Sequence, residues 1–189
     1  NIILPGVTLI LNIPGTGETA AAPNASIGDL DVLAPATGTK TVNIIGAGSA
    51  SSVISQTTGA DRIFDVHPNN TPGGGNITFS ISGASLTGGV ASAPVSGGAL
   101  LAGRPNDAII ITDCIFHLNT ASSNGGAISQ SSAAATHNLT ITNTTFSNNT
   151  ASTASGGAIN YAGRGAVSIT GCTFSGNSAG TQGGAINVT

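Results

Sequence analysis

A motif of two glycines, an alanine and an aliphatic residue recurs four times in the second half of this 189-residue chain. The copies are spaced 28, 31 and 27 residues apart and are Gly97-Gly98-Ala99-Leu100, Gly125-Gly126-Ala127-Ile128, Gly156-Gly157-Ala158-Ile159 and Gly183-Gly184-Ala185-Ile186. A period of about 30 residues is typical of repeat proteins, in which a unit buries its apolar face only against its neighbours. The repeat therefore favours a stacked array of similar units over a conventional globular core.

Two further patterns run in phase with the glycine motif. The first is Phe-x-x-Asn, which places Phe116, Phe146 and Phe174 three residues before Asn119, Asn149 and Asn177, with Leu86 in the phenylalanine position one repeat earlier. The second is an apolar pair seven and five residues before that position: Phe79/Ile81, Ile109/Ile111, Leu139/Ile141 and Val167/Ile169, with Val42/Ile44 and Leu9/Leu11 as less regular earlier members. Alternation of this kind is the period of a β-strand.

Helices are disfavoured because glycine, asparagine, serine and threonine interrupt every unit. We therefore predict an all-β parallel β-solenoid, or β-helix, of about six coils with little or no helix, in which each strand lies about 4.8 Å from its counterpart in the next coil. The whole chain, 1–189, is expected to form one domain, with irregular coils over 1–75 and regular coils of about 28–31 residues over 76–189.

Stacking assigns structural roles to the repeated residues. Asn119, Asn149 and Asn177 are expected to form a ladder of amides at a corner, because asparagine adopts turn conformations and bonds to turn backbone. Phe116, Phe146 and Phe174 are expected to form an internal ladder of rings. The paired glycines supply backbone freedom at a tight corner, and they are Gly97, Gly98, Gly125, Gly126, Gly156, Gly157, Gly183 and Gly184.

The two cysteines occupy one position of the repeat, two residues before Phe116 and Phe174, and Thr144 fills that position in the coil between. Cys114 and Cys172 are then two coils apart, roughly 9 to 10 Å, which is beyond the limit of about 7 Å between bridged Cα atoms. We predict two unpaired, buried thiols.

Composition excludes several functions. The chain has only 4 Lys+Arg and 7 Asp+Glu, 6% charged residues in all, against about 25% in an ordinary domain. A net charge of -3 does not neutralise a phosphate backbone or an anionic membrane surface, so we expect no nucleic-acid partner. No apolar run is long enough for a spanning helix, so we expect no membrane insertion by this segment. The three histidines, His67, His117 and His137, lack zinc-site spacing; we expect them to be exposed, and we expect no metal and no cofactor.

The two motifs together, over residues 97–189, resemble the repeat of bacterial polymorphic outer-membrane proteins and related surface autotransporter passengers. The first half is similar, at 15–18, 28–31, 42–48 and 61–66, to the first coils of secreted bacterial right-handed β-helix proteins that follow a Cys-Ser-Leu-Arg-Glu-Ala leader. The resemblance implies a right-handed parallel β-helix that is secreted or held at the cell surface. The absence of methionine and the final Gly-Gly-Ala-Ile motif suggest a processed or excerpted part of a longer product.

Three functions are compatible with these features. The first is a structural or adhesive surface protein without catalytic residues, whose partners are copies of itself stacked end to end, and a host surface or glycan. Solenoid ends expose unpaired backbone groups, so head-to-tail stacking continues into a filament.

The second function is a polysaccharide lyase or glycoside hydrolase, which needs clustered carboxylates. In the regular half Asp113 aligns with Asn143 and Gly171, so no carboxylate stacks beside it. The other acids near Arg62 and His67 are expected to form an ion pair and turn caps, with a cation site as the alternative; they are Glu18, Asp29, Asp31, Asp61 and Asp65.

The third function is ice binding by a flat hydroxyl array. Thr140/Thr142, Ser168/Thr170 and Ser80/Ser82 are expected to face outward from one sheet. Ile45 and Ile110 interrupt the array, so ordinary surface ladders explain it better. We therefore favour the structural or adhesive function.

Overall fold

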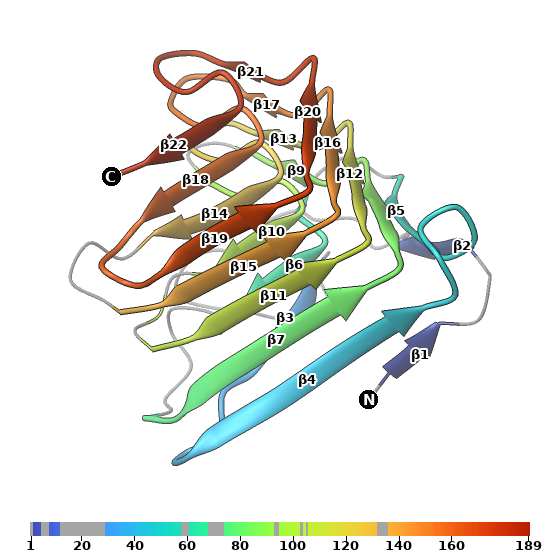
Figure 1. Cartoon of the computed structure of the whole chain (residues 1–189), viewed down its shortest axis with the longest axis vertical. Helices are drawn as coiled ribbons and strands as arrows, with labels where there is room; N and C mark the ends of the chain where they lie inside the picture. The colour runs from blue at the N-terminus through green and yellow to red at the C-terminus, as the bar shows by residue number, and fades with distance from the viewer. Residues whose placement is uncertain are drawn as a thin grey trace.

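The computed structural model describes residues 2–4, 8–11, 29–57, 61–67, 74–92, 95–102, 104, 106–131 and 136–189. The described residues form strands joined by turns and bends, and no helix occurs among them. Every strand pair is parallel, and the strands stack into the walls of a solenoid (Figure 1). The predicted all-β parallel β-helix is confirmed. The described part of the chain contains no helix that is long and apolar enough to cross a membrane.

Four parallel sheets make up the walls, named here in the order in which the chain passes through them. The first sheet contains β1 (Ile2–Leu4), β4 (Thr39–Gly46), β7 (Asn76–Ser82), β11 (Ala108–Thr112), β15 (Asn138–Thr142) and β19 (Val167–Thr170). The second contains β2 (Thr8–Leu11), β5 (Val53–Gln56), β8 (Ser85–Thr87), β12 (Ile115–His117), β16 (Thr145–Ser147) and β20 (Thr173–Ser175).

The third sheet is short and contains β9 (Val90–Ala91), β13 (Thr120–Ala121), β17 (Thr150–Ala151) and β21 (Ser178–Ala179). The fourth contains β3 (Leu30–Val32), β6 (Phe64–Val66), β10 (Leu100–Ala102), β14 (Ile128–Ser131), β18 (Ile159–Ala162) and β22 (Ile186–Val188). Three of the four sheets therefore hold six described strands each, one from each coil.

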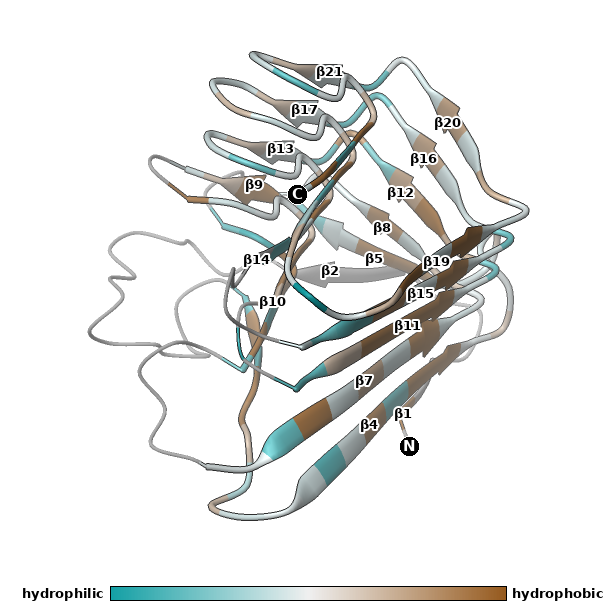
Figure 2. Cartoon of the chain, turned by 60° about the vertical axis from the view of Figure 1, so that its left-hand side comes forward, coloured by the Kyte–Doolittle hydropathy of each residue, from teal (hydrophilic) through white to brown (hydrophobic). Residues whose placement is uncertain are grey.

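The register aligns like residues in columns. In the first sheet one column is isoleucine in all six coils: Ile2, Ile44, Ile81, Ile111, Ile141 and Ile169. Apolar and polar residues alternate along β7 (Figure 2). Its Ile77, Phe79 and Ile81 are wholly buried, and the residues between them are only partly buried. Alternation fixes the register because a slip of one residue would turn the apolar set toward solvent.

One assignment in the first coil is wrong. Leu9 and Leu11 were predicted to belong to the same sheet as Val42 and Ile44, but β2 pairs with β5 and aligns Leu9 with Ile54 in the second sheet. The strand that pairs with β4 is Ile2–Leu4. Alternating apolar residues predict a strand but not its sheet, and the irregular spacing of the first coils does not supply that information.

The corner between the first and second sheets requires left-handed backbone. Asp113 and Asn143 have φ angles of 53° and 49°, and glycine takes the same position in the coils on either side, at Gly83 and Gly171. Asparagine, aspartate and glycine are the residues that adopt this conformation most readily. The corner therefore selects for these residue types in every regular coil.

Candidate functional site

The three repeated asparagines lie one above another between the second and third sheets. The Oδ1 atom of Asn149 accepts hydrogen bonds of 3.0 Å from the backbone N–H and the Nδ2 amide of Asn119. Asn149 donates from the same two groups to Oδ1 of Asn177, again at 3.0 Å. Each Nδ2 amide also donates to a carbonyl of the preceding coil, on Leu86, Phe116 and Phe146 in turn. Asn119 and Asn149 are wholly buried, so the ladder satisfies amides that are away from water.

The phenylalanine rings stack beside this ladder. The centroids of Phe116 and Phe146 lie 5.0 Å apart with their planes inclined by 14°, and those of Phe146 and Phe174 lie 5.0 Å apart at 4°. Phe116 and Phe146 are fully buried, whereas Phe174, in the last coil, is half-buried. The ring stack and the amide ladder together join three successive coils.

The paired glycines line the corner where the chain enters the fourth sheet. The first glycine of each pair is left-handed, with φ of 72°, 65°, 74° and 60° at Gly97, Gly125, Gly156 and Gly183. The second meets the backbone of the next coil: a Cβ atom on Gly126 would lie 2.2 Å from the carbonyl oxygen of Gly157. Gly98 and Gly157 are equally confined, whereas at Gly184 in the last coil the nearest atom would be 3.9 Å away.

The cysteine position forms a column of sulfur and hydroxyl groups. Cys114 and Cys172 are both free, and Thr144 lies between them, donating its hydroxyl to the Thr142 carbonyl at 2.9 Å. Burial raises the pKa of the Cys114 thiol to about 11. The prediction that both thiols are buried is wrong for Cys172, which is half-buried because no described coil lies above it.

These columns lie in segments of the chain that match the repeat of a known family. A model of the Chlamydia polymorphic membrane protein repeat matches residues 113–131, 143–162 and 171–189. The chain carries polymorphic membrane protein repeats. No curated protein and no solved structure gives a significant match.

Each polymorphic membrane protein repeat covers the same part of a coil. It begins at the left-handed corner residue, Asp113, Asn143 or Gly171, and runs through the phenylalanine, the ladder asparagine and the paired glycines into the strand of the fourth sheet. The strands of the first sheet, β11, β15 and β19, lie outside the matched segments. The repeat signature is therefore the set of residues that form the ladders and the corners.

A buried polar cluster lies outside the matched repeats, where the fourth sheet leads into the first. Nδ1 of His67 is 3.0 Å from Oδ2 of Asp107, whose Oδ1 accepts the N–H of Ile77 at 2.7 Å. Burial raises the pKa of Asp107, and the hydrogen bonds from the Ile77 N–H and from His67 oppose that shift. The expectation of exposed histidines is wrong for His67 and His137, which are 4% and 0% exposed.

His137 stands one coil above Asp107 in the same column. Its ring meets the ring of Tyr161 edge-on at a centroid distance of 5.2 Å, and the Tyr161 hydroxyl donates to the His137 carbonyl at 2.7 Å. Burial lowers the pKa of His137, so the ring is neutral near neutral pH. The spacing of 30 residues between Asp107 and His137 is the sequence signal that would have placed both in one column.

The acidic residues of the first coils gather around Arg62. Its Nη1 atom lies 2.7 Å from Oδ2 of Asp65 and 3.4 Å from Oδ2 of Asp29. Single carboxylate oxygens of Asp29, Asp31 and Asp65 lie within 4.8 Å of one another. Asp61 accepts the backbone N–H of Arg62, the next residue, at 2.8 Å. The expected ion pair is therefore present; Glu18 lies outside the described residues.

The outer face of the first sheet carries hydroxyl groups broken by apolar side chains. Thr140 and Ser168 are aligned in neighbouring strands, but Ile110 separates Thr140 from Ser80 in the same column. Ile110 and Ile45 are 36% and 41% exposed. One column of the array is therefore broken, whereas the other runs unbroken through Ser82, Thr112, Thr142 and Thr170 and ends at Ile45.

Proposed function

We propose that this chain is a structural or adhesive module displayed at the cell surface. The observation that carries the proposal is the coincidence of the polymorphic membrane protein repeats with continuous ladders of asparagine and phenylalanine. The family name describes membrane proteins of variable sequence, which supports a place at the outer membrane or cell surface.

The physical properties of the ladders suit such a role. Coils joined by buried amide bonds and ring stacking form a stiff rod, because each coil constrains the next. A stiff rod holds its outer faces at a fixed distance from whatever anchors it. Those faces are the surface that an adhesive module offers to a host surface or a glycan.

Immunogold labelling of source cells tests the location. An antibody against the folded chain is expected to label intact cells as strongly as permeabilised cells. Labelling that appears only after permeabilisation would contradict the proposal. An antibody against a cytosolic protein is the matched control.

Coated beads separate the adhesive role from the structural one. If the module is adhesive, beads coated with it are expected to bind host cells or immobilised glycans. Beads coated with the Asn149→Ala variant, in which the asparagine ladder is broken, are then expected to bind less. A purely structural module gives equal binding for both sets of beads.

A second candidate function is cleavage of an acidic glycan, favoured by the close approach of Asp29, Asp31 and Asp65. Paired carboxylates about 5 Å apart serve retaining glycosidases. The test is product release from pectin or alginate that is lost in the Asp31→Asn and Asp65→Asn variants but kept in Asp113→Asn, an exposed acid in the regular coils. Absence of product from the unaltered chain rejects this candidate.

A further inference from the structure

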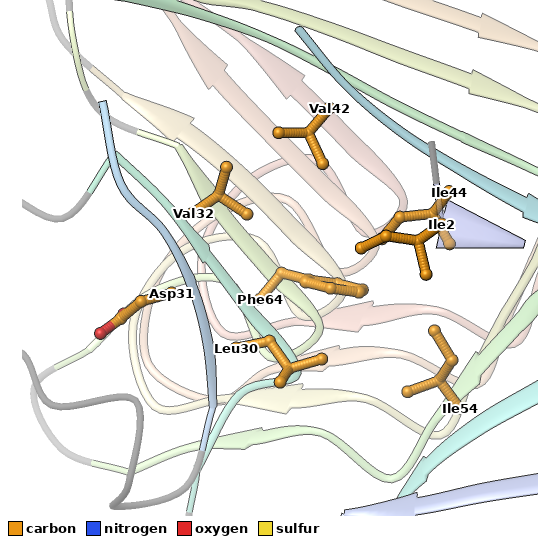
Figure 3. Close-up of a pocket in the computed structure, with 8 residues that line it drawn as sticks. All are labelled: Ile2, Leu30, Asp31, Val32, Val42, Ile44, Ile54 and Phe64. Carbon is orange, nitrogen blue, oxygen red and sulfur yellow. The ribbon is translucent and has the colours of Figure 1, made fainter. Parts of the chain in front are cut away.

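A tyrosine stands in an inward-facing column of the fourth sheet. The column begins at Val32, whose side chain points into the interior while that of Asp31 points away (Figure 3). It continues, coil by coil, through Val66, Ala102 and Gln130 to Tyr161. Tyr161 is 1% exposed, and its hydroxyl donates to the carbonyl of His137. This bond links the fourth sheet to the start of the first sheet in the same coil.

The surroundings of His137 suit only a neutral ring. The residue is 0% exposed, and a Cβ atom on Gly163 would lie 2.3 Å from its Nε2 atom, so the backbone at Gly163 covers that nitrogen. Neither ring nitrogen has a hydrogen-bond partner among the described residues. A protonated ring carries two N–H donors and a positive charge, and burying these without partners is costly.

The carboxylate of Asp107 acts on His137 but is already engaged. Asp107 lies one coil below in the same column, and its charge favours a proton on His137. Its Oδ2 atom is 3.0 Å from Nδ1 of His67, and its Oδ1 atom accepts the N–H of Ile77. Burial has the larger effect and lowers the pKa of His137. Asp107 therefore does not compensate a positive charge on this ring.

The connections around this corner supply no negative charge. Tyr161 stays neutral because burial raises its pKa. The charged residues of the connections are Arg104 and Arg164, and both are positive. No Asp or Glu occurs in the connecting segments, which are 68–75, 103–106, 132–136 and 162–166. These segments therefore offer a proton on His137 no counter-charge.

Closing this corner and binding a proton at His137 therefore oppose each other. An open corner returns the ring to water, where its pKa is the ordinary value of 6.5. As the pH falls below that value, each unit favours the open corner by up to about tenfold, until the pH reaches the lowered pKa of the closed corner. Asp107 acts in the opposite sense, because burial raises its pKa above 3.8 and its protonation favours the closed corner. The two effects have opposite signs, so removal of His137 alone separates them.

The bonds that join the coils lie at another corner. The asparagine ladder stands between the second and third sheets, and its amides take up no proton in mild acid. Opening at His137 breaks the bond from the Tyr161 hydroxyl but leaves the ladder in place. The coils therefore remain joined when this corner opens.

We propose that the contact between His137 and Tyr161 is an acid-sensitive joint, which opens the corner between the fourth and first sheets when His137 takes up a proton. Histidine is the side chain whose charge ordinarily changes between about pH 5 and pH 8. The response is local, because the ladder holds the coils together. This joint goes beyond the proposed surface role and is tested without reference to it.

The first experiment uses the natural probe at this corner. Tyr161 is the single tyrosine of the chain and tryptophan is absent, so tyrosine fluorescence reports on this corner alone. For the purified 189-residue chain, acrylamide quenching is expected to rise about threefold or more between about pH 7.5 and about pH 5, reversibly. Far-ultraviolet circular dichroism is expected to stay the same. Constant quenching, or loss of the β-sheet signal together with the rise, overturns the proposal.

The second experiment removes the proton site and keeps a ring. His137→Phe loses no side-chain hydrogen bond to the described residues, so this variant is expected to fold at neutral pH. Its quenching is expected to be equal at the two pH values. His117→Phe, at a half-buried histidine of β12, is the matched control and keeps the full response. A response that persists in His137→Phe places the effect at His67 or Asp107 and overturns the proposal.

The third experiment needs no variant, so it holds even if His137→Phe does not fold. Hydrogen exchange of the unaltered chain is followed by mass spectrometry and corrected for the effect of pH on the intrinsic rate. The amide of Asn138, which donates to the Asp107 carbonyl at 3.1 Å, is expected to lose protection by about tenfold or more in acid. The amide of Asn149 in the ladder is the matched control and keeps its protection. Equal loss at both amides, or loss at neither, contradicts a local joint.

Discussion

A given residue of the repeat has different properties in different coils, although its type and position are the same. Phe146 is covered by a ring on each side, whereas Phe174 has a ring only below it. Cys114 is buried and Cys172 is half-buried for the same reason. The number of neighbouring coils therefore determines how exposed a side chain is. Its exposure in turn determines its chemical reactivity and its contribution to the stability of the fold.

The cysteines make this difference measurable. Because the pKa of Cys114 is raised to about 11 by burial, its thiol is protonated and covered at ordinary pH. We expect iodoacetamide at about pH 8 to alkylate Cys172 first and Cys114 only after unfolding. Mass spectrometry of the intact chain and its peptides reads both sites, and the Cys172→Ser variant should stay unlabelled while folded. Equal native labelling would contradict the assignment of burial.

Leu118 is a residue in the wrong conformation for its type. Its φ is 54° and its side chain is 55% exposed, whereas Asn148 holds the equivalent position at 55°. A left-handed leucine costs about 1 to 2 kcal/mol, which asparagine largely avoids. We expect Leu118→Asn to raise the free energy of unfolding by about 1 kcal/mol, measured by urea denaturation. Leu118→Ala keeps the strain and should leave the stability unchanged; a destabilised Leu118→Asn variant would refute the strain argument.

For the strands, the regularity of the spacing determines which residues can be assigned to one column from the sequence alone. Ile81, Ile111, Ile141 and Ile169 follow each other at 30, 30 and 28 residues, so their columns are predictable from the period. Ile2 and Ile44 precede them at intervals of 42 and 37, because connections between strands vary in length while the strands keep their register. The columns of the regular coils are therefore predictable from the sequence, whereas the sheet to which a strand of the first coil belongs is not.

The buried cluster of His67, Asp107 and His137 is a second feature that was not predicted from the sequence. Aspartate is mostly exposed in proteins and histidine is intermediate. The 30 residues between Asp107 and His137 match the repeat period, but the 40 residues between His67 and Asp107 do not. The cluster is formed by the corner between the fourth and first sheets, where residues 40 positions apart come within hydrogen-bond distance. The sequence period therefore links Asp107 to His137, whereas the contact with His67 depends on an irregular connection that the period does not describe.

The asparagine ladder is the element whose removal is expected to be most costly. Asn149→Ala leaves the backbone N–H and Nδ2 amide of Asn119 without their shared acceptor in the core. We expect a loss of about 2 to 4 kcal/mol in the free energy of unfolding. Asn177→Ala, in the half-buried last coil, should cost less because water replaces the lost bonds. Thr140→Ala on the outer face is the control and should change stability by less than about 0.5 kcal/mol.

The regular half of the molecule is held mainly by contacts between uncharged groups. Only 6% of its residues are charged, and the Arg62 ion pairs lie in the irregular coils. Backbone ladders, aliphatic columns and buried amides supply the stability of the regular half instead. Salt screens charges but leaves these contacts almost unaffected.

Thermal unfolding at different salt concentrations tests this account. Between about 0.05 and 0.5 M sodium chloride we expect the Tm to change by less than about 3 °C. Sodium sulfate, which strengthens the burial of apolar surface, should raise the Tm. A large fall of Tm in sodium chloride would mean that ion pairs contribute more than the structure indicates.

The direction of the asparagine bonds has a consequence for how the protein acquires its shape. The Nδ2 amide of each ladder asparagine donates to the Oδ1 atom of the asparagine in the following coil, so this bond forms only after the following coil is in place. The Nδ2 amide of that following asparagine also donates to a backbone carbonyl of the coil already formed. A finished coil is thus a template for the one made after it. A chain that leaves a narrow channel with its N-terminus first can therefore fold one coil at a time, before its last residues have emerged.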